Sequence, residues 1–327
     1  MNIREIAKLA KCSPSTVSRV LSSKECDIKI SGKTQSKILE ICAEHDYQPS
    51  IHASRFFSQK SKNIALITPE TPGLDDYSIS KVMNAVCKEL NKNGYRMLPL
   101  IKDAKFIESK EYLGIFKRNE IDALLIWGLE GEKTGWVDEL YAEDLPFVLI
   151  SNRYKNYPGV TCDDKNGIKK LTQHCLERGA KDIVYLSCLK VDCCERRKDG
   201  FIEAIENSGR KYKIIESSGL FIEDGAKAAG EIARLRPDTV ICVNDKVAIG
   251  VMLGLKDSGL KVPDDIMITG ADNIEMGEYF STPLTTFDNC AGECGRESVK
   301  VLMEYFQNGG PLSSSVISPV IHIRNSA

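Results

Sequence analysis

The sequence predicts a small all-α headpiece followed by an α/β core made of two doubly wound parallel-sheet lobes. Three observations support this fold class. The chain has 327 residues, more than one ordinary hydrophobic core accommodates, which favours two or three domains. The first fifty residues show helical apolar spacing, whereas from Asn63 short β-rich runs alternate with amphipathic helices. Residues 1–62 hold eleven Lys or Arg against six Asp or Glu, a balance of +5, and the remainder holds 33 against 40, a balance of −7.

The composition indicates an ordinary globular protein. Hydrophobic residues make up 42% and charged residues 28%, which excludes a mostly disordered or fibrous chain. The longest apolar run, Ala123–Leu129, is far shorter than the roughly 20 residues of a membrane span. Arg4, Glu5, Lys8 and Lys11 stand where a signal peptide needs apolar residues. We therefore expect a cytoplasmic location and no membrane partner.

The headpiece begins with two short helices. Ile3, Ile6, Ala7 and Ala10 repeat at helical spacing, and Lys11–Cys12 ends the pattern. Ser13 is a typical N-cap, and Pro14 suits the first helical position, where its missing N–H costs nothing. The apolar face of this second helix consists of Val17, Val20 and Leu21.

A third helix is predicted to follow a polar, irregular segment. Ser31 caps it, and Tyr47-Gln48-Pro49 ends it, because the residue before proline avoids helical dihedral angles. Its predicted apolar positions are Ile38, Leu39, Ile41 and Cys42. Gly32-Lys33-Thr34 resembles the end of a phosphate loop, but Asp27 stands where that loop needs glycine, so we interpret this segment as the start of the helix.

The core alternates strands with helices in two blocks, around 63–160 and 161–290, which predicts βαβ units. Helices are expected from Ile79 to Gly94 and from Ile168 to Gly179. The predicted strands are 64–68, 96–101, 122–129, 147–151, 182–187, 213–217, 239–244 and 266–272.

Residues 3–22 have the features of a helix-turn-helix motif. Ser15, Ser18 and Arg19 lie opposite the apolar face, and Arg19 can bond guanine O6 and N7 for about 1–3 kcal/mol of base discrimination. Ser13 and Thr16 suit phosphate contacts, which position a protein on DNA without specifying sequence. The alternative is a generic three-helix module with an exposed polar face.

The chain resembles the LacI/GalR transcriptional regulators over nearly its whole length. The resemblance rests on STVSRVL (15–21), the Tyr47-x-Pro49 turn, VNDKVAIG (243–250), VPDDIMITGADN (262–273) and PLTTF (283–287). It implies a helix-turn-helix headpiece, a hinge helix and a core like type I periplasmic sugar-binding proteins. The expected domains are a headpiece (1–49), a hinge (50–62), an N-terminal lobe (63–161 and 291–318) and a C-terminal lobe (162–290 and 319–327).

The hinge departs from the family pattern, which usually has an Ala-Arg-x-Leu stretch with a leucine wedged into the minor groove. Here residues 53–57 read ASRFF, with Phe56 at the leucine position. Phe56 or Phe57 can serve as the wedge, or both can pack on the core. The expected DNA contacts are Ser13, Pro14, Ser15, Thr16, Ser18, Arg19, Ser31, Thr34, Tyr47, Ser50, Arg55 and Phe56.

Ligand-binding residues are expected where parallel strands end. By resemblance, Asn244 and Asp272 contact the effector, and Arg197 holds hydroxyl groups from the side opposite Asp272. Asp76, Tyr77 and Trp127 follow strands of the first lobe, although Trp127 suits the core equally well. Asn289 and Arg153 are expected as further contacts. Asp245 is either an effector contact or a helix cap, and Ser151 stands where the family often has an acidic residue.

The remaining motifs point away from catalysis and metal binding. The twelve cysteines show no zinc spacing and are interpreted as small buried hydrophobic residues, with Cys193–Cys194 and Cys290/Cys294 as redox-sensitive alternatives. The four histidines are dispersed, and no nucleotide-binding, zinc-protease or hydrolase motif is present. We expect no enzymatic activity, no metal site and no cofactor.

The sequence thus predicts a repressor that binds a near-palindromic operator as a homodimer and responds to a small effector. The expected effector is a sugar, with β-galactosides favoured by residues 29–41 and a purine as the alternative. A sugar-binding protein without a DNA role and a sugar-processing enzyme are the other hypotheses. Residues 319–327 show no leucine heptads, which favours a dimer over a coiled-coil tetramer.

Overall fold

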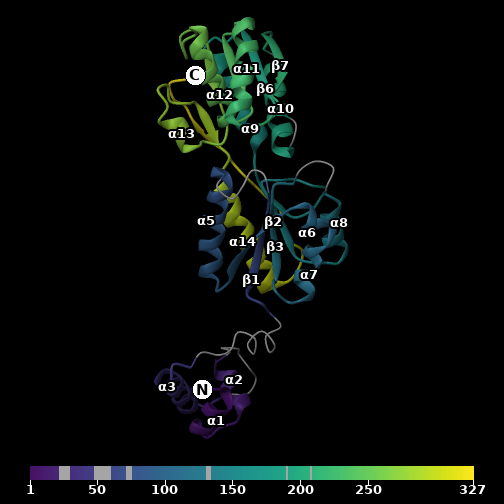
Figure 1. Cartoon of the computed structure of the whole chain (residues 1–327), viewed down its shortest axis with the longest axis vertical. Coiled ribbons are helices and arrows are strands. Elements are labelled where there is room, and N and C mark those ends of the chain that lie inside the picture. The colour runs from purple at the N-terminus through teal and green to yellow at the C-terminus, as the bar shows by residue number, and fades with distance from the viewer. Residues whose placement is uncertain (22–29, 48–59, 71–75, 130–133, 189–190, 207) are drawn as a thin grey trace. The chain divides into compact units, whose positions relative to one another are not determined.

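The structure is a computed structural model that describes residues 1–21, 30–47, 60–70, 76–129, 134–188, 191–206 and 208–327. The chain divides into two compact units, Met1–Ser61 and Lys62–Ala327. The predicted fold class is confirmed, because the described part of the first unit is all-α and the second is an α/β core with two parallel sheets (Figure 1).

A polar cap residue precedes each helix of the headpiece. The helices are α1 (Ile3–Ala10), α2 (Pro14–Leu21) and α3 (Gly32–Glu44). The Ser13 hydroxyl accepts a hydrogen bond from the Thr16 amide at 3.0 Å, and the Ser31 hydroxyl accepts one from the Thr34 amide at 3.3 Å. Both predicted caps are confirmed, and residues 32–34 begin a helix as expected.

The apolar faces of the three helices meet in a small core. Its buried members are Ile6, Ala7, Ala10, Val17, Ile38 and Cys42. The prediction for Leu39 is wrong, since its side chain is 53% exposed. Successive helical residues are rotated by about 100°, so Leu39 points away from the face that buries Ile38.

The first lobe of the core is a six-stranded parallel sheet between two helical layers. The strands are β1 (Asn63–Pro69), β2 (Arg96–Lys102), β3 (Ala123–Trp127), β4 (Phe147–Ile150), β5 (Gly159–Cys162) and β11 (Ser315–Ile317), in the order β11-β5-β4-β3-β1-β2. Ile64 and Leu66 face α5 (Tyr77–Lys92) and α14 (Ala291–Asn308). Ala65 and Ile67 face the opposite layer, α6 (Ala104–Glu108), α7 (Glu111–Lys117) and α8 (Gly135–Ala142).

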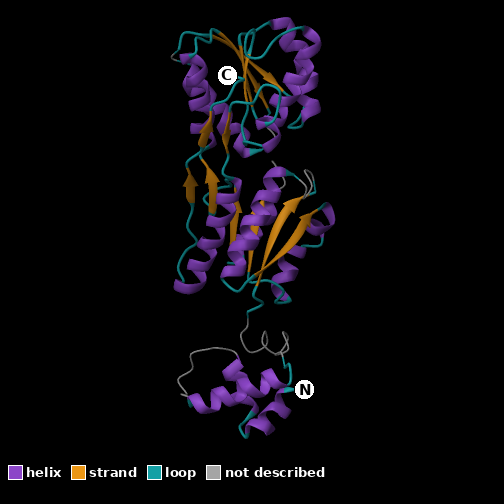
Figure 2. Cartoon of the chain, turned by 90° about the vertical axis from the view of Figure 1, so that its left-hand side faces the viewer, coloured by secondary structure: helices purple, strands orange, loops and turns teal. Residues whose placement is uncertain are grey.

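The second lobe repeats this plan with four parallel strands. They are β6 (Asp182–Ser187), β7 (Lys211–Glu216), β8 (Thr239–Cys242) and β9 (Met267–Thr269), in the order β7-β6-β8-β9. One face packs against α11 (Ile222–Leu235) and α12 (Asp245–Leu255), and the other against α9 (Asp164–Glu177) and α10 (Asp192–Ile205). Figure 2 shows helices and strands layered in this way in both lobes. Two short helices, η1 (Lys256–Ser258) and α13 (Glu275–Glu278), complete this lobe.

The chain passes between the lobes three times. The passages join β5 to α9, β10 (Thr286–Asp288) to α14, and β11 to β12 (Val320–His322). β10 and β12 form an antiparallel pair, whereas β11 is the edge strand of the first sheet. Sequence reasoning did not predict β5, β10, β11 or β12, because these short strands gain their stability from distant partners.

Candidate nucleic-acid interface and ligand cavity

The N-terminal half of α2 exposes a cluster of hydroxyl groups. The Ser13 hydroxyl lies 2.7 Å from that of Ser15 and 2.8 Å from that of Thr16. The first amides of a helix have no intrahelical acceptors and carry the positive end of the helix dipole. These hydroxyls and amides therefore form a surface that can bind a phosphate group.

The side chain of Arg19 extends from the exposed side of the same helix, whereas Val17 is fully buried beneath it. Val17 anchors α2 in the headpiece core, which fixes the side that α2 presents to solvent. This arrangement suits insertion of α2 into a major groove.

The other predicted DNA contacts lie in different settings. Pro14 is exposed, Ser18 is half-buried, and the hydroxyls of Ser31 and Thr34 lie 2.8 Å apart at the start of α3. Tyr47 packs against the headpiece core. Ser50, Arg55, Phe56 and the alternative wedge Phe57 fall outside the described residues.

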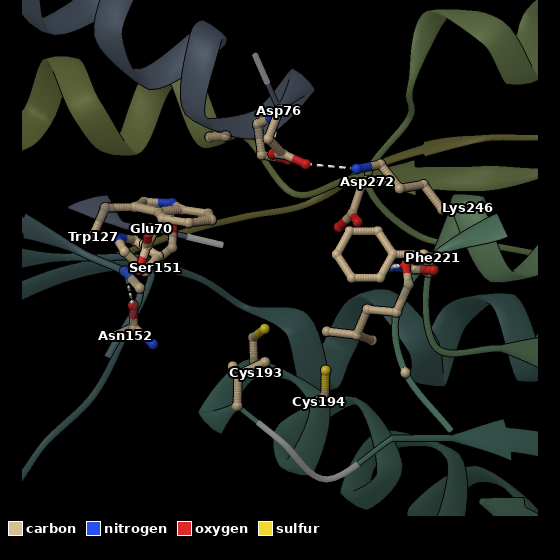
Figure 3. A pocket seen from close by; sticks show the side chains of 18 of the residues that line it. Glu70, Asp76, Trp127, Ser151, Asn152, Cys193, Cys194, Phe221, Lys246 and Asp272 are labelled. Carbon is tan, nitrogen blue, oxygen red and sulfur yellow. Dashed lines mark hydrogen bonds and ion pairs between the residues drawn. The ribbon is translucent and has the colours of Figure 1, made fainter. Parts of the chain in front are cut away.

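A cavity of about 1400 Å³ lies between the two lobes of the core (Figure 3). Polar and aromatic side chains of both lobes line it. The seven residues of the predicted ligand site all belong to this lining: Asp76, Tyr77, Trp127, Arg197, Asn244, Asp272 and Asn289. Their contact with an effector stays a prediction.

Arg197 is held by three hydrogen bonds inside the protein. Its guanidinium donates to Asp164 at 2.8 Å, to the carbonyl of Val243 at 2.8 Å and to Asp272 at 2.6 Å. The expectation that Arg197 and Asp272 act from opposite sides of a ligand is therefore wrong, because the two side chains form a direct ion pair. The side chain of Arg197 is only 4% exposed and that of Asp272 17%, so Asp272 presents more of the pair to the cavity.

Asp272 occupies an unusual backbone conformation. Its φ of 107° lies in a region that residues other than glycine rarely adopt, and its amide donates to the carbonyl of Phe287 at 2.8 Å. Asn289 donates to the Asp272 carboxylate at 2.9 Å. Burial raises the pKa of Asp272, and the charge and hydrogen bond of Arg197 oppose that rise. Such strain is typical of functional sites.

The hypothesis that Asp245 caps the following helix is wrong. Asn244 is the N-cap of α12 and accepts from the Val247 amide at 2.8 Å, while its own amide group donates to the carbonyl of Leu220 at 3.0 Å. Asp245 is fully buried and accepts from the Thr286 hydroxyl at 2.6 Å and from the Ile274 amide at 2.8 Å. Asp245 thus ties α12 to the segments after β9 and at β10, and it does not line the cavity.

Burial has a large effect on the acidity of Asp245. It raises the pKa of this carboxyl to about 7, and repulsion from Asp272 adds to the rise. The hydrogen bond from Thr286 opposes the shift but does not cancel it.

An ion pair joins the two lobes at the cavity. Asp76 caps α5 by accepting from the amides of Ser78 and Ile79, and its second oxygen lies 2.6 Å from the ammonium of Lys246 at the start of α12. Figure 3 shows the pair spanning between the lobes. Lys246 lies within the VNDK motif, yet sequence reasoning assigned it no role because its partner is 170 residues away.

Aromatic rings line both sides of the cavity. Trp127 ends β3 in the first lobe, and Phe221 precedes α11 in the second (Figure 3). Trp127 also contacts the apolar core of its lobe, so both alternatives for this residue describe part of its environment. Sequence reasoning missed Phe221, since no motif marks it. It also missed Asp164, which holds Arg196 and Arg197 together.

Of the two remaining candidates, Ser151 lines the cavity and Arg153 does not. Ser151 lines the cavity in a left-handed conformation with a φ of 60°. Asn152 beside it accepts from the amides of Gly128 and Leu129 and thereby orders the end of β3. Arg153 is exposed and is not part of the lining; its backbone amide donates to Asp192 at 2.9 Å.

No group of His, Cys, Asp or Glu suited to hold a metal ion occurs within the described residues. Among the helices that the structure describes, none is long and apolar enough to cross a membrane.

Comparison with known proteins matches a part of each unit to a family. Residues 2–50 match the lacI family of bacterial regulatory proteins, and residues 172–327 match the periplasmic binding protein-like domain. The transcriptional regulator DegA of Bacillus subtilis is 28% identical over 306 residues, covering 90% of this chain and 88% of DegA. The ribose operon repressor of Halalkalibacterium halodurans is 27% identical over 311 residues, covering 93% and 90%.

The fold is shared with the lac repressor dimer, solved bound to operator and the anti-inducer ONPF. That structure superposes with a TM-score of 0.86 at 19% identity, covering 100% of this chain and 98% of the repressor chain. These relatives are regulators, in agreement with the expectation that the chain is not an enzyme. The chain thus combines a lacI-family headpiece at residues 2–50 with a periplasmic binding protein-like domain at residues 172–327, and the relatives that it resembles along most of its length are transcriptional regulators.

Proposed function

We propose that this protein is a repressor that binds a near-palindromic operator as a homodimer and is controlled by a small sugar in the cavity between the lobes. One observation carries the proposal: both lobes line the cavity, and the ion pair from Asp76 to Lys246 joins them across it. A ligand bound there contacts both lobes and can change their relative orientation.

On DNA, each α2 helix reads one half-site. Arg19 supplies the forked donor for guanine, while Ser15 and Ser18 flank it, and Ser13 and Thr16 hold the phosphate backbone. We further propose that the hinge residues Ser50 and Arg55 contact the operator centre, with Phe56 wedged between base steps. Two-fold symmetry of the dimer then accounts for two half-sites.

In the cavity, a sugar fits the chemistry of the lining. Trp127 and Phe221 can stack against the apolar ring face of a sugar. Carboxylates such as Asp272 can accept hydrogen bonds from its hydroxyl groups. The similarity to a ribose operon repressor supports a sugar in general. The preference for a β-galactoside rests on the sequence alone.

Effector binding then controls operator affinity by a population shift. One lobe arrangement lets the paired hinges order on DNA, and the other does not. A coupling free energy of about 1–3 kcal/mol corresponds to about a 5–150-fold change in operator affinity. We propose that the sugar releases the operator.

The test uses the full chain and genomic DNA fragments selected by binding to it. Fluorescence anisotropy of a selected fragment is measured with ribose, galactose, a β-galactoside or hypoxanthine. We expect one sugar to weaken binding, and an effect of hypoxanthine alone would replace the sugar by a purine. Failure to select any DNA would contradict the DNA-binding role.

Effector binding can be measured without DNA. Both tryptophans of the chain, Trp127 and Trp136, line the cavity, so a bound sugar should change the intrinsic fluorescence. Trp127→Phe leaves Trp136 as the reporter and serves as the matched control. A sugar that changes operator binding but leaves both fluorescence signals and the heat of titration unchanged would place the site elsewhere.

A further inference from the structure

Two cysteines lie where the chain passes between the lobes. Cys162 is the last residue of β5, directly before the passage into α9. Cys290 follows β10, directly before α14 and the return into the first lobe. The proposed function requires the lobes to reorient about these passages. That function assigns no role to Cys162 or Cys290.

The two thiols lie close to the backbone of the passages between the lobes. Each contacts the carbonyl of Asp288, with Sγ-to-oxygen distances of 3.9 Å for Cys162 and 3.5 Å for Cys290. The Cys290 Sγ lies 3.7 Å from the carbonyl of Ser318 in the third passage, and Cys162 pairs in register with Ile317. Because both Sγ atoms lie near the same carbonyl oxygen, the two thiols are neighbours in the fold.

Their surroundings give the thiols different reactivities. Cys290 is half-buried, and the hydrogen bond from Cys162 lowers its pKa, which favours the nucleophilic thiolate. Cys162 is 2% exposed, and its pKa is raised by the hydrogen bond to Cys290 and by burial. A reactive thiol that touches a protected one is the arrangement of a thiol that is oxidised and a second that resolves it.

Cys290 also has a constrained backbone. Its φ of 53° is left-handed, and its amide donates to the Asp288 carboxylate at 2.7 Å. These features hold its side chain at the passage and give it a defined position relative to Cys162.

We propose that Cys162 and Cys290 form an oxidation site that hydrogen peroxide converts into a disulfide, which links two of the three passages between the lobes. The Cys290 thiolate attacks one peroxide oxygen; the S–O bond forms, the O–O bond breaks, and the leaving oxygen takes protons to become water. The Cys162 thiol then loses its proton and attacks the sulfenic sulfur; the S–S bond forms and a second water leaves. Two thiols are oxidised by two electrons in total, and one peroxide is reduced to two waters.

The consequence for regulation rests on the proposed function. A covalent link between two passages restricts the rotation of one lobe against the other. The oxidised protein should therefore keep one operator affinity whether the effector is present or absent. Reduction by a dithiol would restore the response.

The chemical test needs neither DNA nor effector. The full chain is treated with hydrogen peroxide, its remaining thiols are alkylated, and tryptic peptides are mapped by mass spectrometry. Trypsin leaves Cys162 on residues 156–165 and Cys290 with Cys294 on residues 262–296. We expect these peptides to be cross-linked, with fragment ions that assign the bond to Cys290.

Matched variants separate this bond from other thiol chemistry. Cys290→Ser should abolish the cross-link, whereas Cys87→Ser, which removes a half-buried thiol in α5, should leave it unchanged. Peroxide should raise the Tm of the wild type by roughly 4–15 °C, because the bond closes the second lobe into a loop, and should not raise that of Cys290→Ser. A disulfide at Cys193–Cys194, or Cys290 oxidised without a cross-link, would overturn the proposal.

The regulatory consequence is tested last. Operator binding is compared with and without the active sugar of the panel, before and after oxidation. We expect the ligand-dependent change to fall to less than about twofold from the 5–150-fold range of typical coupling. A mapped disulfide with an undiminished ligand response would reject the regulatory role alone, whereas a missing ligand response in the reduced protein would reject the proposed function.

Discussion

Replacing Arg197 by alanine should unfold the second lobe more readily, and not only remove an effector contact. The guanidinium is almost fully buried and donates to two carboxylates and one backbone carbonyl. Its loss leaves Asp164 and Asp272 without their shared cation, although Arg196 still contacts Asp164. Breaking a buried ion pair by removing one partner costs about 3–5 kcal/mol.

That cost corresponds to a fall in Tm of about 6–20 °C for a domain of this size. Thermal unfolding followed by circular dichroism, together with urea midpoints, measures it. Asp272→Asn is the matched control, because it leaves Arg197 paired with Asp164 and should cost only about 1–2 kcal/mol. If Arg197→Ala unfolds within about 1 kcal/mol of the wild type, the guanidinium does not support this lobe, and the reasoning is refuted.

Three further predictions address the DNA surface, a buried carboxyl and the ion pair between the lobes. Arg19→Ala should lose about 1–3 kcal/mol of preference for operator over scrambled DNA in gel shifts, and it should keep salt-sensitive nonspecific binding. A variant that retains the preference would exclude base reading by Arg19. Asp245 keeps its proton in the native state up to about pH 7, whereas the unfolded chain loses it near pH 4, so the free energy of unfolding should fall as pH rises between these values. Asp245→Asn should remove this fall, roughly 3–4 kcal/mol between pH 4 and 8 in urea titrations, and an unchanged pH profile would contradict it. Asp76→Asn retains an N-cap but loses the charge that pairs with Lys246, so acrylamide should quench the cavity tryptophans more strongly, while Tm shifts by less than about 4 °C. Asp76→Ala also loses the cap, so its free energy of unfolding should be lower by about 1 kcal/mol more. Equal quenching in the wild type and both variants would argue against a link between the lobes.

The sequence was most informative where structure depends on neighbouring residues. The caps Ser13 and Ser31 and the start of α2 at Pro14 follow from local hydrogen bonding and fixed dihedral angles. Apart from β5 and β11, the strands of the two large sheets follow from β-rich runs with helices between them. The error at Leu39 shows that a run of apolar residues does not by itself say which of them faces the core.

The site required contacts that no local pattern encodes. Asp76 and Lys246 lie far apart in the sequence and meet only because two lobes face each other. Arg197 was expected to bind ligand, but its burial between two carboxylates, which also gives it a supporting part in the second lobe, has no signal in the local sequence. Asn244 and Asp245 have similar propensities as caps, and only the positions of Val247 and Ile274 decide which carries that role.

The threading of the chain also affects how the protein is made. The first sheet gains its edge strand β11 and its covering helix α14 only from residues 291–317, after the whole second lobe has been synthesised. Until then the apolar face that α14 covers, formed by β1, β3 and β4, is left open on a nascent chain, as is the unpaired edge of β5. At about 5–20 residues per second, translation keeps that surface exposed for roughly ten seconds or more, which makes the N-terminal lobe the natural client of a chaperone during synthesis.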